Sequence, residues 1–127
     1  MKKIFTEHAP SAIGPYSHAI RSGNLIFCSG QTPLNPQTMQ IEGETVTEQT
    51  TLALTNLENV LKAEGCNRTH IVKTSVFLKN FADFEKMNKA YEVFFDEHKP
   101  ARTTIEVSRL PKEALVEIEC VAEAPAS

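Results

Sequence analysis

The sequence predicts an α+β fold, a mixed sheet of about six strands with two helices on one of its faces. Two stretches, 46–64 and 84–95, carry apolar residues at helical spacing. The stretches around them are short runs rich in Val, Ile and Thr, bounded by Gly, Pro and Asn, as in strands. Because strand–helix–strand crossovers are right-handed, both helices are expected on the same face of the sheet.

The composition is that of one soluble globular domain spanning residues 1–127. The chain has 127 residues, of which 41% are hydrophobic and 23% are charged, ordinary values for such a domain. The three cysteines are odd in number and widely spaced, and we interpret them as reduced thiols.

Net charge and hydropathy argue against two classes of partner. The net charge is -3 at pH 7, whereas binding to nucleic acid phosphates requires a basic surface, so no nucleic acid partner is expected. The sequence has no apolar run of membrane-spanning length and its first residues lack the apolar core of a signal peptide. We therefore expect a cytoplasmic protein without a membrane partner.

The first half of the chain is expected to hold a hairpin and a helix. A short strand at 4–6 precedes strands at 16–21 and 24–29, which flank a Ser-Gly turn. After a long loop at 30–43, Thr45 and Glu48 form a capping-box pattern that predicts the start of the first helix.

The second half alternates strand and helix. A strand is predicted at 70–78, and the second helix is expected to begin near Asn80 or Asp83 and to end before Pro100. Two further strands, 100–107 and 115–121, are expected around a turn.

The last two strands alternate in a way that predicts a functional face. In this interpretation Arg102 shares one face of the sheet with Glu117 and Glu119, while the apolar residues of the same strands face the core. Two helices cover only one face, and the other would also expose Leu115 and Val121. Burial against another copy of the chain, with sites between subunits, would resolve this exposure.

The residues of this face permit binding of a small carboxylic acid. The guanidinium of Arg102 matches a carboxylate with two parallel hydrogen bonds, and a nearby glutamate can hold or deprotonate a water molecule. The alternative is a salt bridge, within the chain or across an interface, between Arg102 and Glu117 or Glu119. The four histidines lack ligand spacing and the common nucleotide and metal motifs are absent, so neither a metal nor another cofactor is expected.

Two other residues have open interpretations. Tyr16 follows Gly14 and Pro15, where it can wall a pocket or simply pack. Asn88 interrupts the apolar stripe of the second helix and can contact a ligand or satisfy buried backbone groups.

Several blocks of the chain form a recognisable set. They are Ile13-Gly14-Pro15-Tyr16-Ser17, Phe27-Cys28-Ser29-Gly30-Gln31, Ile71-Val72-Lys73-Thr74-Ser75-Val76-Phe77-Leu78, Met87-Asn88-Lys89-Ala90-Tyr91 with Phe94-Phe95, Pro100-Ala101-Arg102-Thr103, and Leu110-Pro111-Lys112 with Val116-Glu117-Ile118-Glu119. In this order and without a sizeable gap, they resemble the RidA (YjgF) family from about residue 4 to residue 122.

The resemblance implies a chorismate-mutase-like fold and a homotrimer whose ligand clefts lie between subunits. It also implies hydrolysis, without a cofactor, of reactive 2-imino acids or their enamine tautomers to 2-keto acids and ammonia. By position, the resemblance makes Arg102 the carboxylate-binding arginine and Glu117 the water-positioning glutamate. The remaining implied substrate-binding residues are Tyr16, Ser29, Gly30 and Asn88.

One position departs from the family pattern. Many active members have a cysteine where this chain has Thr104. Imine hydrolysis does not require a thiolate, and Thr104 can still offer backbone groups to a substrate. A binding module that captures 2-keto acids without turnover is the main alternative, and a surface-acting partner protein is a third.

Overall fold

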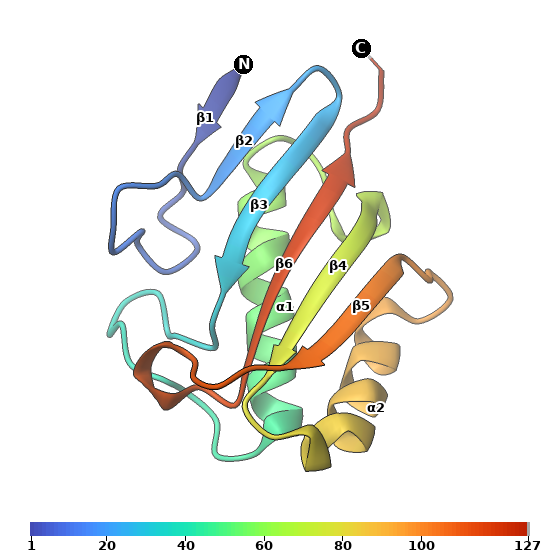
Figure 1. Ribbon diagram of the computed structural model, residues 1–127. Coiled ribbons are helices and arrows are strands. Elements are labelled where there is room, and N and C mark those ends of the chain that lie inside the picture. Colours follow the sequence, from blue (N-terminus) through green and yellow to red (C-terminus); the bar gives the residue numbers. More distant parts are fainter. Residues whose placement is uncertain (127) are drawn as a thin grey trace.

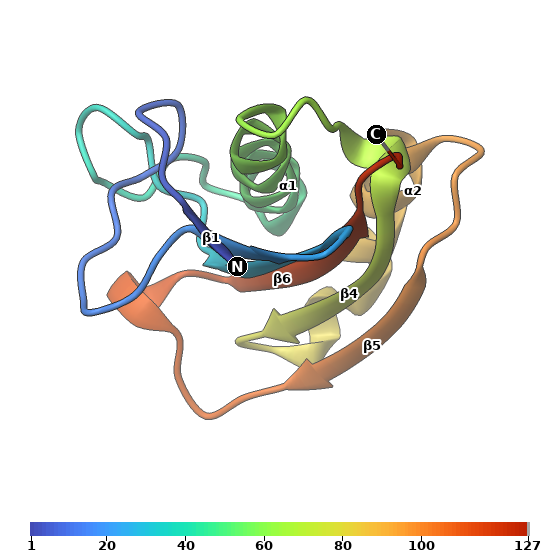
Figure 2. The same ribbon diagram turned by 90° about the horizontal axis from the view of Figure 1, so that it is seen from above.

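The computed structural model describes residues 1–126 as a six-stranded mixed sheet with both long helices on one face (Figures 1 and 2). The strand order is β1-β2-β3-β6-β4-β5. The elements in chain order are β1 (Lys2–Ile4), β2 (Ala19–Ser22), β3 (Leu25–Gln31), α1 (Val46–Lys62), η1 (Arg68–His70), β4 (Ile71–Leu78), η2 (Phe81–Asp83), α2 (Phe84–Phe95), β5 (Ala101–Glu106), η3 (Pro111–Glu113) and β6 (Val116–Glu123). The predicted fold class is confirmed.

Local signals in the sequence set the start of α1 and the turn of the first hairpin. The Thr45 side chain accepts a hydrogen bond from the Glu48 amide at 3.2 Å, and the Glu48 carboxylate accepts from the Thr45 amide at 3.3 Å. These reciprocal bonds satisfy backbone donors that a helix start would otherwise leave unpaired. Between β2 and β3 the turn contains Gly23, whose φ of 63° favours glycine.

The second helix begins in two steps. The Asn80 side chain accepts from the amide of Ala82 at 3.0 Å and caps η2, which leads directly into α2. The helix ends at Phe95, and the next residue, Asp96, has a φ of 56°, ahead of Pro100.

The pairing of the last two strands differs from the prediction. Strands β5 and β6 are not neighbours, because β4 lies between them, parallel to β5 and antiparallel to β6. The chain from β4 through α2 to β5 is a strand–helix–strand unit, which places its two strands side by side and parallel. The segment after β5 then carries the chain back to a central position in the sheet (Figure 1).

The core lies between the sheet and the two helices. It includes buried side chains from α1, α2 and every strand except β5, among them Leu54, Leu57, Phe94, Ile118 and Val76. The other face of the sheet has no helix over it (Figure 2), and Phe27 and Ile105 are 46% and 45% exposed there. Over residues 1–126, no helix combines the length and apolarity needed to cross a membrane.

Candidate active site

A bulge in β3 forms the first part of the site. Cys28 pairs with Cys120 and Gln31 with Ile118, so β3 has one more residue than β6 between these pairs, and the bulge contains Ser29 and Gly30. The β6 residue between these two pairs is Glu119, and Glu117, two residues before it, reaches the bulge with its side chain. A Cβ atom on residue 30 would lie 2.5 Å from Glu117 Oε2, so the carboxylate rests directly against the glycine backbone.

The loop that carries Tyr16 is attached to the same bulge. The Ser29 hydroxyl donates to the Ser17 carbonyl at 2.8 Å and the Ser29 amide donates to the His18 carbonyl at 3.0 Å. Tyr16 is 46% exposed, and its hydroxyl accepts from the Ile13 amide at 3.4 Å. We call Tyr16, Ser29, Gly30 and Glu117 the Glu117 half-site.

The protonation of Glu117 is shifted by its surroundings. Burial, and to a smaller extent the neighbouring Glu119 carboxylate, raise the pKa of Glu117 above its usual range. A raised pKa makes a carboxylate a better base and allows it to return a proton nearer neutral pH. Raised carboxylate pKa values in partly buried positions are typical of active sites.

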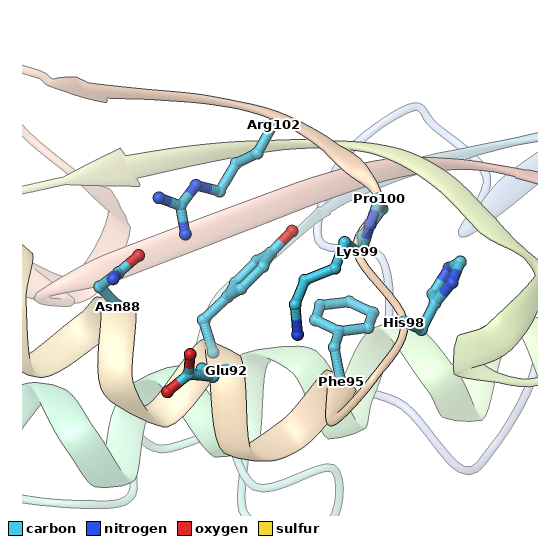
Figure 3. A pocket seen from close by; sticks show the side chains of 8 residues that line it. Asn88, Glu92, Phe95, His98, Lys99, Pro100 and Arg102 are labelled. Carbon is cyan, nitrogen blue, oxygen red and sulfur yellow. The ribbon is translucent and has the colours of Figure 1, made fainter.

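Arg102 forms the second part of the site, at the edge strand β5. It lines a pocket of about 360 Å³ between β5 and α2 together with Asn88, and Figure 3 shows the Arg102 guanidinium and the Asn88 amide pointing toward one another. No ion pair joins Arg102 to a side-chain carboxylate of residues 1–126. The guanidinium is therefore free to bind an anion from outside the chain.

Thr104 lies two residues along the same strand. Its hydroxyl oxygen is buried and has no hydrogen-bond partner within residues 1–126. Side chains two residues apart in a strand share a face, so Thr104 lies beside Arg102. We call Asn88, Arg102 and Thr104 the Arg102 half-site.

The structure corrects the expectation that Arg102 and Glu117 share one face of the sheet. Arg102 is in register with Thr74, which is fully buried under the helices, and Thr74 in turn is in register with Cys120. Glu117 stands three residues before Cys120 on β6, so it points to the opposite, helix-free face. A salt bridge between Arg102 and Glu117 or Glu119 within one chain is thus excluded, and the two half-sites lie on opposite faces.

Sequence reasoning missed the aromatic residues around Arg102. The Arg102 guanidinium carbon lies 4.7 Å from the ring centroid of Tyr91 and 5.7 Å from that of Phe84. Both residues belong to α2, and the apolar periodicity of this helix predicts only that such residues are buried. A signal was present, because a buried tyrosine within such a stripe has a hydroxyl that needs a partner.

The remaining residues that line the Arg102 pocket were also not predicted. They are Glu92, Phe95, His98, Lys99 and Pro100. Within residues 1–126 no group of three or more His, Cys, Asp or Glu side chains is arranged to hold a metal ion.

Fold and half-sites together define a class: small α+β proteins with a glutamate that packs against a bulge in the neighbouring strand, and an arginine on the edge strand without an ion-pair partner among residues 1–126. The family model described as Endoribonuclease L-PSP matches residues 6–124. The chain therefore belongs to this family. The resemblance to RidA is confirmed by relatives that carry the name of an imine deaminase.

Three of these relatives span nearly the whole chain. A RutC family protein of Pyrococcus horikoshii is 48% identical over 94% of both chains. The 2-iminobutanoate/2-iminopropanoate deaminase of Escherichia coli is 45% identical over 95% of this chain and 96% of its own. The crystal structure of E. coli TdcF with bound serine superposes with a TM-score of 0.93 at 40% identity, covering 98% of this chain and 100% of TdcF.

Proposed function

We propose that this protein is a hydrolytic deaminase that converts small 2-imino acids to 2-keto acids and ammonia. The observation that carries the proposal is the Arg102 guanidinium, which faces a pocket of about 360 Å³ without an ion-pair partner among residues 1–126. The E. coli relative that carries the deaminase name supports the choice of reaction.

Arg102 supplies the binding step. A 2-imino acid has a carboxylate next to its C=N bond, and the planar guanidinium binds a carboxylate through two parallel hydrogen bonds. The Asn88 side chain, which points toward Arg102 in Figure 3, is placed to contact the same ligand. Thr104, whose hydroxyl is buried and has no partner among residues 1–126, lies on the same face of the strand two residues further on.

Glu117 supplies the proton transfers. Its carboxylate accepts a proton from water as the water oxygen bonds to the carbon of the protonated imine, which gives a neutral carbinolamine. Glu117 returns this proton to the nitrogen, the C–N bond breaks to release ammonia, and the hydroxyl gives its proton to the carboxylate as the C=O bond forms. One imino acid and one water thus give one 2-keto acid and one ammonia. The raised pKa of Glu117 suits this exchange, and the electrophilic imine needs mainly an oriented water molecule.

We place the complete site between two subunits of a homotrimer. Arg102 and Glu117 lie on opposite faces of the sheet, so one chain does not bring them to one substrate. The helix-free face exposes Phe27 and Ile105, which burial against further copies of the chain would cover. In this arrangement one subunit contributes the Arg102 half-site and its neighbour the Glu117 half-site.

A coupled assay tests the activity. An amino-acid oxidase generates 2-iminobutanoate, semicarbazide traps it, and the protein competes with the trap. The native chain should lower semicarbazone formation. Arg102→Ala should lose about 100-fold or more in kcat/KM, because it removes a pair of charged hydrogen bonds to the substrate carboxylate. Arg68→Ala is the matched control, since Arg68 also stacks on an aromatic ring but lies elsewhere, against Phe94 at 3.7 Å.

Mixed oligomers test the placement between subunits. Arg102→Ala and Glu117→Gln chains should each have little activity alone, but a cleft formed between one chain of each kind can combine the intact arginine with the intact glutamate. Random assembly of equal amounts gives about one intact cleft in four, so about a quarter of native activity should return. Mixtures that stay inactive despite verified exchange of subunits would place both residues in one subunit's site.

A binding module that captures 2-keto acids without turnover is the second candidate. E. coli TdcF, a structural neighbour solved with bound serine, supports binding of a small carboxylic acid by this fold. Calorimetric binding of 2-ketobutanoate that depends on Arg102, without loss of semicarbazone, would favour this candidate over the deaminase.

A further inference from the structure

The environment of the Arg102 guanidinium is aromatic rather than acidic. The Tyr91 ring centroid lies 4.7 Å from the guanidinium carbon and the Phe84 ring centroid 5.7 Å from it. Both distances are within the range of about 6 Å over which a cation is attracted to an aromatic ring. Aromatic rings leave the positive charge of the guanidinium uncompensated and its N–H groups free to donate. A carboxylate partner would compensate that charge and accept hydrogen bonds from the N–H groups.

The Tyr91 ring is fixed on two sides. Its hydroxyl shares a hydrogen bond of 2.7 Å with the Thr74 hydroxyl, and its ring packs against Phe95 with centroids 4.7 Å apart. Burial raises the pKa of Tyr91, so its hydroxyl keeps its proton at neutral pH. The ring is therefore a rigid surface rather than a mobile cover.

The same tyrosine joins the two strands on which the site depends. Thr74 on β4 is in register with Arg102 on β5, so the hydroxyl of Tyr91 holds one member of this cross-strand pair while its ring holds the other. Rotation of the ring would break the bond to Thr74, a fully buried residue whose hydroxyl would then lack its partner. The position of the guanidinium is thus tied to the hydrogen bond beneath it.

We propose that Tyr91 is a positioning residue for the substrate carboxylate, acting through Arg102. It supports the guanidinium from below without neutralising it, so that the outer N–H groups remain directed to the ligand. This inference rests on the proposed function and adds a residue to it. Tyr91 does not take part in proton transfer, so it acts on binding and not on the chemical step.

Steady-state kinetics separate this role from a purely structural one. Tyr91→Leu should raise KM about tenfold, the strength of a partly buried cation–π contact, with kcat within about twofold of native. Tyr91→Phe retains the ring but loses its hydrogen bond to Thr74, so its KM should fall between the native and Tyr91→Leu values. A structural role would instead reduce the amount of active enzyme, which lowers kcat and leaves KM unchanged.

Phe94→Leu is the matched control. It removes an aromatic ring from the same helix and from another arginine, Arg68, at 3.7 Å, and it should leave KM unchanged. A native KM in Tyr91→Leu, or an equal rise in Phe94→Leu, would overturn the inference.

The outcome also separates this inference from the proposed function. If the native chain neither releases ammonia nor binds 2-ketobutanoate, the proposed function fails and Tyr91 has no ligand to position. If the native chain is active and Arg102→Ala is not, an unchanged KM in Tyr91→Leu overturns only the role of Tyr91.

Discussion

Gly30 and Glu117 are in contact across the bulge of β3, and the absence of a side chain at residue 30 is what lets the carboxylate occupy its position. A Cβ atom there would lie 2.5 Å from Glu117 Oε2 and 3.1 Å from its Cδ. The glycine therefore acts on Glu117 by leaving space for it. Its role in the site is separate from the ability of glycine to adopt positive φ.

Gly30→Ala should reduce activity more than stability. The added methyl group displaces the Glu117 carboxylate, and a misplacement of about 1 Å in a catalytic group costs up to about 100-fold in rate. The carboxylate is the end of a flexible side chain and can move aside, so the stability loss should stay below about 1 kcal/mol. Kinetics and urea unfolding of the same sample measure both effects.

Gly23→Ala provides the opposite pattern. Gly23 has a φ of 63° and no neighbouring atom within 4 Å of an added Cβ, so alanine there costs about 1 kcal/mol through backbone strain alone. Its kcat/KM should equal the native value. Native activity in Gly30→Ala would show that Glu117 does not need its observed position.

Glu117→Gln should stabilise the protein at neutral pH while it lowers kcat about 100-fold or more, the contribution of a general acid–base. The folded state raises the pKa of Glu117, mainly by burial. As pH rises from about 4.3, the unfolded chain loses this proton first, so ionisation of Glu117 weakens the fold over the range up to its raised pKa. Glutamine does not ionise, so Glu117→Gln lacks this loss of stability.

The pH dependence is the check on that explanation. Thermal unfolding should give Glu117→Gln the higher Tm at pH 7, and the difference should vanish below about pH 4, where the carboxyl group is protonated in both states. A Tm difference that is the same at both pH values would assign the effect to packing instead of charge.

Thr104→Cys should keep kcat/KM within about threefold of native, because hydrolysis through Glu117 and Arg102 uses no thiolate. The Thr104 hydroxyl is buried without a partner, so Thr104→Val should be neutral or should stabilise the fold by up to about 1 kcal/mol. Chemical unfolding and the coupled assay test the two substitutions side by side. A tenfold gain in Thr104→Cys would show that sulfur at this position contributes to catalysis.

The local features of the fold could be predicted from sequence because they depend on neighbouring residues. The Thr45–Glu48 capping box and the Ser22–Gly23 turn are interactions within a few positions, and both occur as expected. Periodicity located the two helices and the last four strands to within about two residues at each end. The first strand, expected at 4–6, is instead Lys2–Ile4, and the second, expected at 16–21, is Ala19–Ser22.

The arrangement of Arg102 could not be predicted in this way. Alternation along 100–107 gives two faces but does not say which one meets the core, and on an edge strand both faces are partly exposed. Ile105, assigned to the core by its apolar side chain, is 45% exposed, while Arg102 turns toward the helices. The insertion of β4 between β5 and β6 is a long-range pairing that leaves no local signal.

Glu58→Gln should lower the free energy of unfolding at pH 7 by about 2 kcal/mol, which lies between the contributions of exposed and fully buried ion pairs. The substitution should leave kcat/KM unchanged. Glu58 is buried and accepts hydrogen bonds from the Arg68 side chain at 2.8 and 3.0 Å and from its amide at 2.9 Å. These bonds, above all the side-chain bond from Arg68, lower the pKa of Glu58. The stability they provide is present above about pH 4.3 and is lost as pH falls through the lowered pKa. Urea unfolding from pH 7 to pH 3 should therefore show a steeper loss for the native chain than for the variant, whereas Glu97→Gln, at an exposed position, should follow the native curve.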